Sequence, residues 1–339
     1  MAIDKLDLTS CCLSGDGFVE IANALASSQA SLRVLCVGSD TVSFMARKLL
    51  NVIGDRGVDT MASALRTTSS LRSLRLNGTM MTQHQADRLM AALKDSCTLE
   101  VLCLEENCLG PKACTALAEC LSRSESIRQL CLQESQINAD GAVALANGLE
   151  KNSTLRELDL HNNHIYAKGG IALAKALQNN SSLEVLNLAY ARIHTEGAIE
   201  MASALESNQT LKVLNLVSNE IYDHGVSALG KALMSNKTLH TLLLGGNKVQ
   251  KDGVIAIASA LQSNTSLLKL DLSNASRTEP GGSEALSEAL HANSVLQELI
   301  IDNSSFSLRT VLSGPPASTF GPHLSDGGSV SQAILAQFP

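Results

Sequence analysis

The amino-acid sequence predicts an α/β fold: a horseshoe-shaped solenoid of about eleven strand–helix units, with a parallel sheet on its concave face. Three observations support this prediction. The spacing L-x-x-L-x-L returns at a constant step of 28 residues through the middle of the chain. Each copy contains a short segment of period 2, which is typical of a strand. Each copy is followed by apolar residues three and four positions apart, which is typical of one helix face.

The most regular part of this pattern begins at Leu155. Its leucine triplets, in chain order, are Leu155, Leu158, Leu160; Leu183, Leu186, Leu188; Leu211, Leu214, Leu216; Leu239, Leu242, Leu244; and Leu267, Leu270, Leu272. The last two leucines of a triplet point to one face of a strand, and the residue between them points to the other face. A glycine follows nine residues after each of the first four triplets, and helix-spaced apolar residues come after it. The unit is therefore strand, loop, helix and loop.

Stacking of these units explains the expected curvature. One unit cannot bury its own leucines, so neighbouring units bury them against one another. Each buried leucine contributes roughly 1.5–3 kcal/mol of transfer free energy. Adjacent strands lie about 4.8 Å apart, whereas helix axes need about 8–10 Å. The stack must therefore curve with its strands on the inside.

We expect the solenoid to occupy residues 1–305. Its first unit opens at Ile3, and its last recognisable triplet ends at Ile301. Solenoids need polar end units, and no separate cap precedes the first unit. Either that unit caps itself poorly, or the chain is the C-terminal part of a longer protein. The tail, residues 306–339, is rich in Pro, Gly and Ser, and we expect it to be disordered or loosely docked.

One insertion interrupts the repeat. The step from Leu32 to Leu71 is 39 residues, so about eleven residues have been added to the regular 28. The helix positions of that unit keep their usual spacing, which places the insertion near residues 38–52. Its apolar residues favour packing on the convex shoulder over a contact site, because isolated exposed apolar residues are common.

Two series of asparagines recur with the units. One lies three residues after the third leucine and comprises Asn107, Asn163, Asn219 and Asn247. We expect these amides to satisfy backbone groups of adjoining loops, in a ladder that other units interrupt. The second lies three residues after the last helix leucine and comprises Asn152, Asn180, Asn208, Asn236, Asn264 and Asn293. Because asparagine tolerates the left-handed conformation, we expect this series to end the helices in that conformation.

Composition narrows the function classes. The 339 residues carry a net charge of −7, and aromatic residues make up only 2% of the chain, so nothing indicates a nucleic-acid surface. We expect no signal peptide, because the first residues are already strand-like, and no apolar run is long enough for a membrane span. Nine cysteines, an odd number in a long chain without a signal, favour reduced thiols. We expect a cytoplasmic monomer.

No catalytic motif is present. The sequence lacks a Walker-type phosphate loop, a G-x-S-x-G elbow, an H-E-x-x-H helix and an EF-hand loop, so we predict no enzyme and no cofactor. Glu105, Glu106 and Glu134 gather at the ends of adjacent strands, where a solvated acidic patch is favoured over acid–base catalysis. His161 and His164 share one loop, and exposed loop residues are favoured over a metal pair because no third ligand is in view.

The cysteines also show no metal-binding motif. Cys36, Cys103 and Cys131 each occupy the middle position of a strand, which places them on the concave face. Zinc sites are recognised by C-x-x-C pairs or by a characteristic Cys/His spacing, and neither occurs here. We therefore predict no metal site.

The candidate binding site is a patch on the concave face of the sixth to ninth units. Outward strand positions there are mostly apolar, with two asparagines at the centre and a polar rim in the sixth unit, which resembles an interface core with a few polar groups. The predicted partner-binding residues are Asp159, His161, Val185, Asn187, Tyr190, Val213, Asn215, Val217 and Leu243. The alternative is that these positions are simply tight sheet packing.

The repeat also resembles a known family. The unit N-x-[ST]-L-x-x-L-x-L-x-x-N-x-I-x-x-x-G-x-x-x-L-A-x-A-L, visible from Asn152 to Leu177, resembles the ribonuclease-inhibitor-like class of leucine-rich repeats. Its uniform step is most similar to the repeat domain of NOD-like receptors, although the nucleotide-binding domain that precedes those repeats is absent here. The Ran GTPase-activating protein shares the helix pattern G-x-x-x-L-A-x-A-L, and that similarity implies a GTPase-activating function. Its acidic tail has no counterpart, because residues 306–339 contain one acidic residue.

Two functional hypotheses follow. The first is a non-enzymatic interaction module or scaffold that binds a protein partner on its concave face, in innate-immune-type or regulatory signalling. A long preformed surface favours this hypothesis, because it loses little entropy on binding. The alternative is a GTPase-activating protein for a Ran-like small GTPase.

Overall fold

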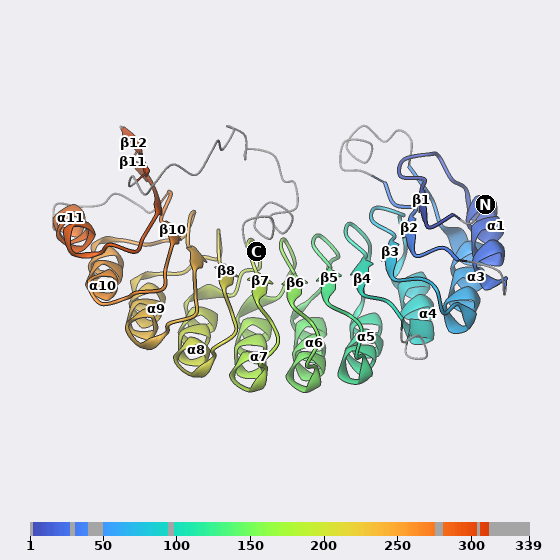
Figure 1. The fold of residues 1–339 in the computed structure, drawn as a ribbon, viewed down its shortest axis with the longest axis horizontal. Helices are drawn as coiled ribbons and strands as arrows, with labels where there is room; N and C mark the ends of the chain where they lie inside the picture. Colours follow the sequence, from blue (N-terminus) through green and yellow to red (C-terminus); the bar gives the residue numbers. More distant parts are fainter. Residues whose placement is uncertain are drawn as a thin grey trace.

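The computed structural model describes residues 3–27, 31–39, 50–93, 98–274, 281–303 and 306–311. Within these ranges the chain forms a horseshoe with strands on the inner side and helices on the outer side (Figure 1). Eleven strands, β1–β11, pair in parallel in strict sequence order, and ten helices cover them. The predicted fold class and number of units are confirmed.

Each parallel strand is only three to six residues long and coincides with the period-2 part of the leucine pattern. The strands are β1 (Lys5–Asp7), β2 (Val34–Cys36), β3 (Ser73–Arg75), β4 (Val101–Cys103), β5 (Gln129–Cys131), β6 (Glu157–Asp159), β7 (Val185–Asn187), β8 (Val213–Asn215), β9 (Thr241–Leu243), β10 (Lys269–Asp271) and β11 (Glu298–Asn303). Their central leucines pair in register, as Leu158 does with Leu186 and Leu186 with Leu214. All three are buried in one continuous apolar core, as the inward assignment predicts.

The helices follow the strands through short loops and present alanines, leucines and glycines to the core. They are α1 (Gly15–Ala26), α3 (Gly54–Thr67), α4 (Gln83–Leu93), α5 (Pro111–Arg123), α6 (Ala139–Lys151), α7 (Tyr166–Asn179), α8 (His194–Ser207), α9 (Asp223–Ser235), α10 (Lys251–Leu261) and α11 (Gly282–Ala292). Small residues allow neighbouring helices to approach closely. A Cβ atom on Gly148 of α6 would lie 2.6 Å from the carbonyl oxygen of Ala118 on α5.

The first asparagine series forms the predicted ladder. Asn163 donates through Nδ2 to the carbonyl oxygens of Leu132 and Leu160, at 2.8 and 3.0 Å. Its Oδ1 accepts from the backbone N–H groups of Ser135 and Ile137, at 3.1 and 2.9 Å. One buried amide therefore satisfies loop backbone of its own unit and of the preceding unit. The equivalent side chains are buried and bonded in the same way: Asn107, Asn219 and Asn247.

Asn51 occupies the same position in the unit that carries the insertion. Its Nδ2 donates to the carbonyl oxygens of Leu8 and Val37, at 2.8 and 2.9 Å, and its Oδ1 accepts from the N–H of Leu13 at 2.8 Å. Without the eleven added residues, this asparagine would stand three positions after Val37, where the ladder asparagine belongs. The repeat therefore resumes at Asn51. The packing predicted for the insertion itself concerns residues 40–49, which lie outside the described residues.

The second asparagine series corrects a prediction. At its helix-capping members Asn152, Asn180, Asn208, Asn236 and Asn293, φ lies between −70° and −87°, so none adopts the left-handed conformation. The side chain explains the residue instead. In Asn180, Nδ2 donates to the carbonyl oxygens of Leu149 and Asn152, both at 2.8 Å. Its Oδ1 accepts from the N–H of Leu183 at 2.8 Å. This series is a second ladder, at the opposite end of the helices.

The sheet extends beyond its eleventh parallel strand. The backbone of β12 (Phe306–Val311) pairs antiparallel with β11. The segment that we expected to begin the tail therefore starts with a strand at the C-terminal edge of the sheet. The remaining tail, residues 312–339, lies outside the described residues. Among the residues described, no helix is both long and apolar enough to cross a bilayer.

Candidate functional site

The predicted concave patch is mostly buried. Asp159, Val185, Asn187, Val213, Asn215 and Leu243 each expose 8% or less of their surface. The expected exposure is therefore wrong for six of the nine residues. Side chains of one column repeat at the strand spacing of about 4.8 Å, so each covers the flanks of its neighbours.

The polar members of the patch bind their own chain. The Oδ1 atom of Asp159 accepts from the backbone N–H of His161 at 3.0 Å, and its Oδ2 accepts from Nδ2 of Asn187 at 3.1 Å. Asn187 and Asn215 each accept at Oδ1 from the N–H two residues further on, at 3.1 Å. These side chains hold the turns that leave the strands, which is the behaviour of Asx turns.

Three predicted residues stay accessible to solvent. His161 and Val217 are half-buried, and Tyr190 is 52% exposed. All three lie just after the strands, where the loops rise towards the helices. The accessible part of the predicted site is therefore the rim of the sheet.

This rim continues into a larger surface, of which the predicted binding residues include only His161 and Tyr190. We call it the tyrosine edge: His161, His164, Tyr166, Tyr190, Arg192, His194 and Tyr222, on the strand-to-helix loops and helix starts of the sixth to eighth units. It contains all three tyrosines of the chain. Tyr166, Tyr190 and Tyr222 are 40%, 52% and 53% exposed. A regularity in the sequence would have identified it, because Tyr166 and Tyr222 both stand six residues after a third leucine.

Side chains of adjacent units contact one another along this edge. Tyr166 stacks on His164, and the guanidinium of Arg192 lies 5.9 Å from the Tyr166 ring centroid. Tyr190 meets His161 edge-on, with ring centroids 5.7 Å apart. The two histidines therefore contact different tyrosines: His161 contacts Tyr190, and His164 contacts Tyr166.

The backbone of the tyrosine edge is held in an uncommon conformation. Tyr166, Tyr190, Arg192 and His194 have φ between 54° and 58°, in the left-handed region that bulky residues rarely adopt. The next unit holds three of them in place. The N–H groups of Tyr166, Tyr190 and His194 donate to carbonyl oxygens of that unit, at 3.1, 2.8 and 3.1 Å. The tyrosines are therefore positioned by the stack and not by their own loop alone.

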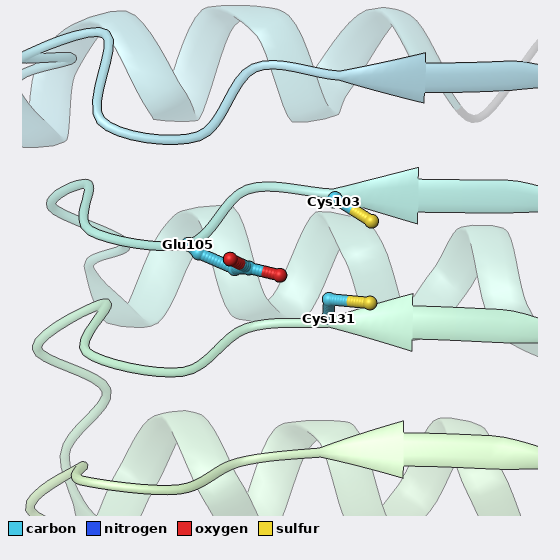
Figure 2. A group of neighbouring side chains, drawn as sticks. All are labelled: Cys103, Glu105 and Cys131. Carbon is cyan, nitrogen blue, oxygen red and sulfur yellow. The ribbon is translucent and has the colours of Figure 1, made fainter. Parts of the chain in front are cut away.

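A second site lies on the concave face of the fourth and fifth units. Cys103 ends β4, Cys131 ends β5, and the two residues are partners in the sheet register. Figure 2 shows the two cysteine side chains on neighbouring strands, with Glu105 extending towards them from the segment after β4. One ligand atom from each of the three side chains lies within 4.8 Å of the others. We call these three residues the thiol–carboxylate cluster.

Three polar neighbours surround the thiol–carboxylate cluster. Nη1 of Arg75 donates to the Cys103 sulfur at 3.2 Å. Nδ2 of Asn77 donates to Glu105 Oε2 at 3.1 Å, and the side chain of Gln133 also hydrogen-bonds to Glu105. Among the described residues, the amide oxygens of Asn77 and Gln133 have no hydrogen-bond partner. Arg75 and Asn77 also line a cleft of about 500 Å³ over β1–β3, which borders the cluster.

Burial perturbs the acids of this region. Desolvation, assisted by the carboxylate of Asp159, raises the pKa of Glu105 to about 7. A hydrogen bond with Cys103 and desolvation both raise the pKa of the Cys131 thiol. Desolvation also raises the pKa of Asp159. The sequence predicted that Glu105 belongs to a solvated acidic patch. The burial of its carboxylate shows that it does not.

The sequence hides the thiol–carboxylate cluster because its members are not close in the chain. Cys103 and Cys131 stand 28 residues apart, which is one repeat, and Glu105 follows Cys103 by two positions, in the turn after β4. Motif searches look for cysteines two to four residues apart. In a solenoid, one repeat length is also a spacing that brings side chains together.

Comparisons with known proteins agree with the repeat pattern. A family model described as a leucine-rich repeat matches residues 151–174, 179–202, 207–230 and 235–258. Comparison with curated proteins gives no match.

Three solved structures are among those similar to the chain. Actin-binding site 2 of leiomodin-1 has 24% identity and a TM-score of 0.37, covering 40% of this chain and 79% of that one. The C-terminal domain of tropomodulin from Caenorhabditis elegans has 21% identity and a TM-score of 0.39, covering 45% and 92%. The yeast Rad7 and Elc1 complex has 14% identity and a TM-score of 0.48, covering 89% and 76%. The matched repeats and the eleven parallel strands give this chain the fold of a leucine-rich-repeat solenoid.

Proposed function

We propose that this protein is a non-enzymatic interaction module that binds a protein partner through the tyrosine edge and the adjoining concave rim. One observation carries the proposal: all three tyrosines of a chain without tryptophan are exposed on three consecutive units. Tyrosine and arginine are the residues most enriched at the energetic centres of protein interfaces, and Arg192 lies among the tyrosines.

The geometry of the tyrosine edge suits binding. Tyrosine offers a large apolar ring with a polar hydroxyl, and has few rotatable bonds to immobilise. Hydrogen bonds to the next unit already hold the backbone of Tyr166 and Tyr190, so ordering costs little when the partner binds. Val217 and His161 extend the surface onto the rim, while the buried patch residues support it from beneath. A signalling role like that of NOD-like receptors stays a prediction.

The test is a pull-down from lysate, quantified by mass spectrometry. Tyr190→Asn and Tyr222→Ala remove two rings without disturbing the loops, because asparagine tolerates a positive φ and already stands at the equivalent position of the sixth unit, at Asn162. Loss of a residue at the energetic centre of an interface costs about 2 kcal/mol or more of binding free energy. We therefore expect the affinity of the double variant for its specific partner to fall by roughly 30-fold or more.

The matched control carries Ile199→Ala and Met234→Ala. These two side chains are exposed to a similar extent, 43% and 49%, but lie on helices α8 and α9. The control should retain the partner. Equal recovery with all three proteins, each shown to be folded, would contradict the proposed surface. Recovery of a small GTPase would instead support the activator hypothesis, if this protein accelerates GTP hydrolysis by that GTPase.

A further inference from the structure

We propose that Cys103, Glu105 and Cys131 form a binding site for a thiophilic divalent cation, with Zn²⁺ the best match. Two thiolates and one carboxylate are a donor set that zinc accepts, whereas hard cations such as Mg²⁺ and Ca²⁺ prefer oxygen alone. The site is separate from the tyrosine edge and does not depend on the proposed partner.

The distances allow a tetrahedral ion with little movement. Ligand atoms around zinc stand about 3.8 Å apart when the metal–sulfur bonds are about 2.3 Å. The three ligand atoms already lie within 4.8 Å of one another, so each pair must close by about 1 Å at most. The sheet register holds Cys103 and Cys131 opposite each other, and side-chain rotation supplies the remaining movement. A water molecule takes the fourth position, as in other zinc sites with three protein ligands.

The charges also balance around a divalent ion. The three ionised ligands carry three negative charges, the ion carries two positive charges, and the guanidinium of Arg75 supplies one more. Arg75 donates to the Cys103 sulfur and so favours the thiolate, which is the form that binds metal.

The surroundings of Glu105 support the same assignment. Asn77 and Gln133 both donate to its carboxylate, which orients that group as the partners of metal ligands commonly do. Gln133 is 91% buried, and its unpartnered amide oxygen lies beside the cluster. A water molecule bound to the ion would donate a hydrogen bond to this oxygen, which has no other donor among the described residues.

The experiment uses Co²⁺ as a spectroscopic substitute for Zn²⁺ on the full chain, reduced beforehand and handled without oxygen. We expect one Co²⁺ per chain, with a thiolate-to-cobalt charge-transfer band and the visible bands of a tetrahedral ion, both abolished when Zn²⁺ displaces the cobalt. Cys103→Ser and Cys131→Ser should each abolish the charge-transfer band of this site. Glu105→Gln should weaken binding by roughly 100-fold or more, since even partners of metal ligands are worth about 10–100-fold.

Cys36→Ser is the matched control, because Cys36 lies in the same concave column, on β2, outside the cluster. It should leave the spectrum unchanged. A band that survives both Cys103→Ser and Cys131→Ser would place the metal on other thiols and overturn the proposal. Binding without a thiolate band would place it on histidines and overturn it equally.

A second measurement uses the wild-type protein, so it tests the site even if the cysteine variants do not fold. In the wild-type protein, Zn²⁺ should slow alkylation of Cys103 and Cys131 at least about tenfold relative to Cys36 and Cys114, mapped by peptide mass spectrometry. Equal alkylation rates with and without Zn²⁺ would refute the site. The thermal midpoint should also rise with zinc concentration in wild type and in Cys36→Ser, because an ion that binds only the folded state stabilises it.

Discussion

At the scale of single residues, buried asparagine side chains hold adjoining loops together. Each ladder asparagine offers two donors and an acceptor from a short side chain, and the loops between units need both to satisfy their buried backbone groups. The insertion makes this requirement visible. Eleven added residues shift the chain, yet Asn51 is placed where Asn107 and Asn163 stand in their own units.

Asn51→Ala should therefore destabilise the N-terminal units. The substitution leaves Leu13 N–H and the carbonyl oxygens of Leu8, Val37 and Gly38 without this partner. We expect the free energy of unfolding to fall by about 2–4 kcal/mol, measured by urea denaturation. Asn179→Ala is the control, because the exposed side chain of Asn179 donates to Glu150 at the surface, at 2.8 Å. If both variants unfold at the same urea concentration, Asn51 is not a ladder residue.

At the scale of elements, the helices are limited by how closely they pack. Strands need only about 4.8 Å, and wide helix spacing on the outer face gives the horseshoe its curvature. Where a helix approaches its neighbour most closely, a glycine removes the side chain. Gly148 is such a position, since the nearest atoms to an added Cβ belong to the backbone of Ala118.

Gly148→Ala should destabilise the protein even though alanine favours helices. The gain in helix propensity is about 1 kcal/mol, whereas overpacking against fixed backbone costs about 1–3 kcal/mol. We expect a net loss of roughly 1 kcal/mol and a lower thermal midpoint by calorimetry. Gly282→Ala provides the comparison, because its Cβ would meet Val254 at an ordinary 3.5 Å. A Gly148→Ala protein as stable as Gly282→Ala would show that α5 and α6 can separate without cost.

At the scale of the whole molecule, stability depends on contacts between neighbouring units. Each unit contributes leucines to one continuous core, so damage to one unit removes support from both neighbours. In β2 to β10 the central leucine of each strand exposes 1% or less of its surface.

Leu214→Asp should unfold several units at once. Leu214 is fully buried, so the substitution places an unpaired carboxylate in the core and costs about 4 kcal/mol or more. Hydrogen exchange followed by mass spectrometry should show lost protection in the seventh to ninth units and retained protection nearer the N-terminus. Ile199→Asp, at a 43% exposed position, should leave exchange unchanged. Uniform protection in the Leu214 variant would contradict the inward assignment of the strand leucines.

The sequence by itself determined the repeat length, the number of units, the parallel order of the strands and the inward direction of residues such as Leu158 and Leu214. Periodicity within one unit decides these features, so a linear reading is sufficient. Only the tertiary structure decided that Asn187 and Asn215 are covered, that Cys103, Glu105 and Cys131 meet, and that all three tyrosines are exposed. Exposure and side-chain proximity depend on residues one repeat away, because stacked strands place position i beside position i + 28. The pattern within one unit does not show which side chains of the neighbouring units lie beside it.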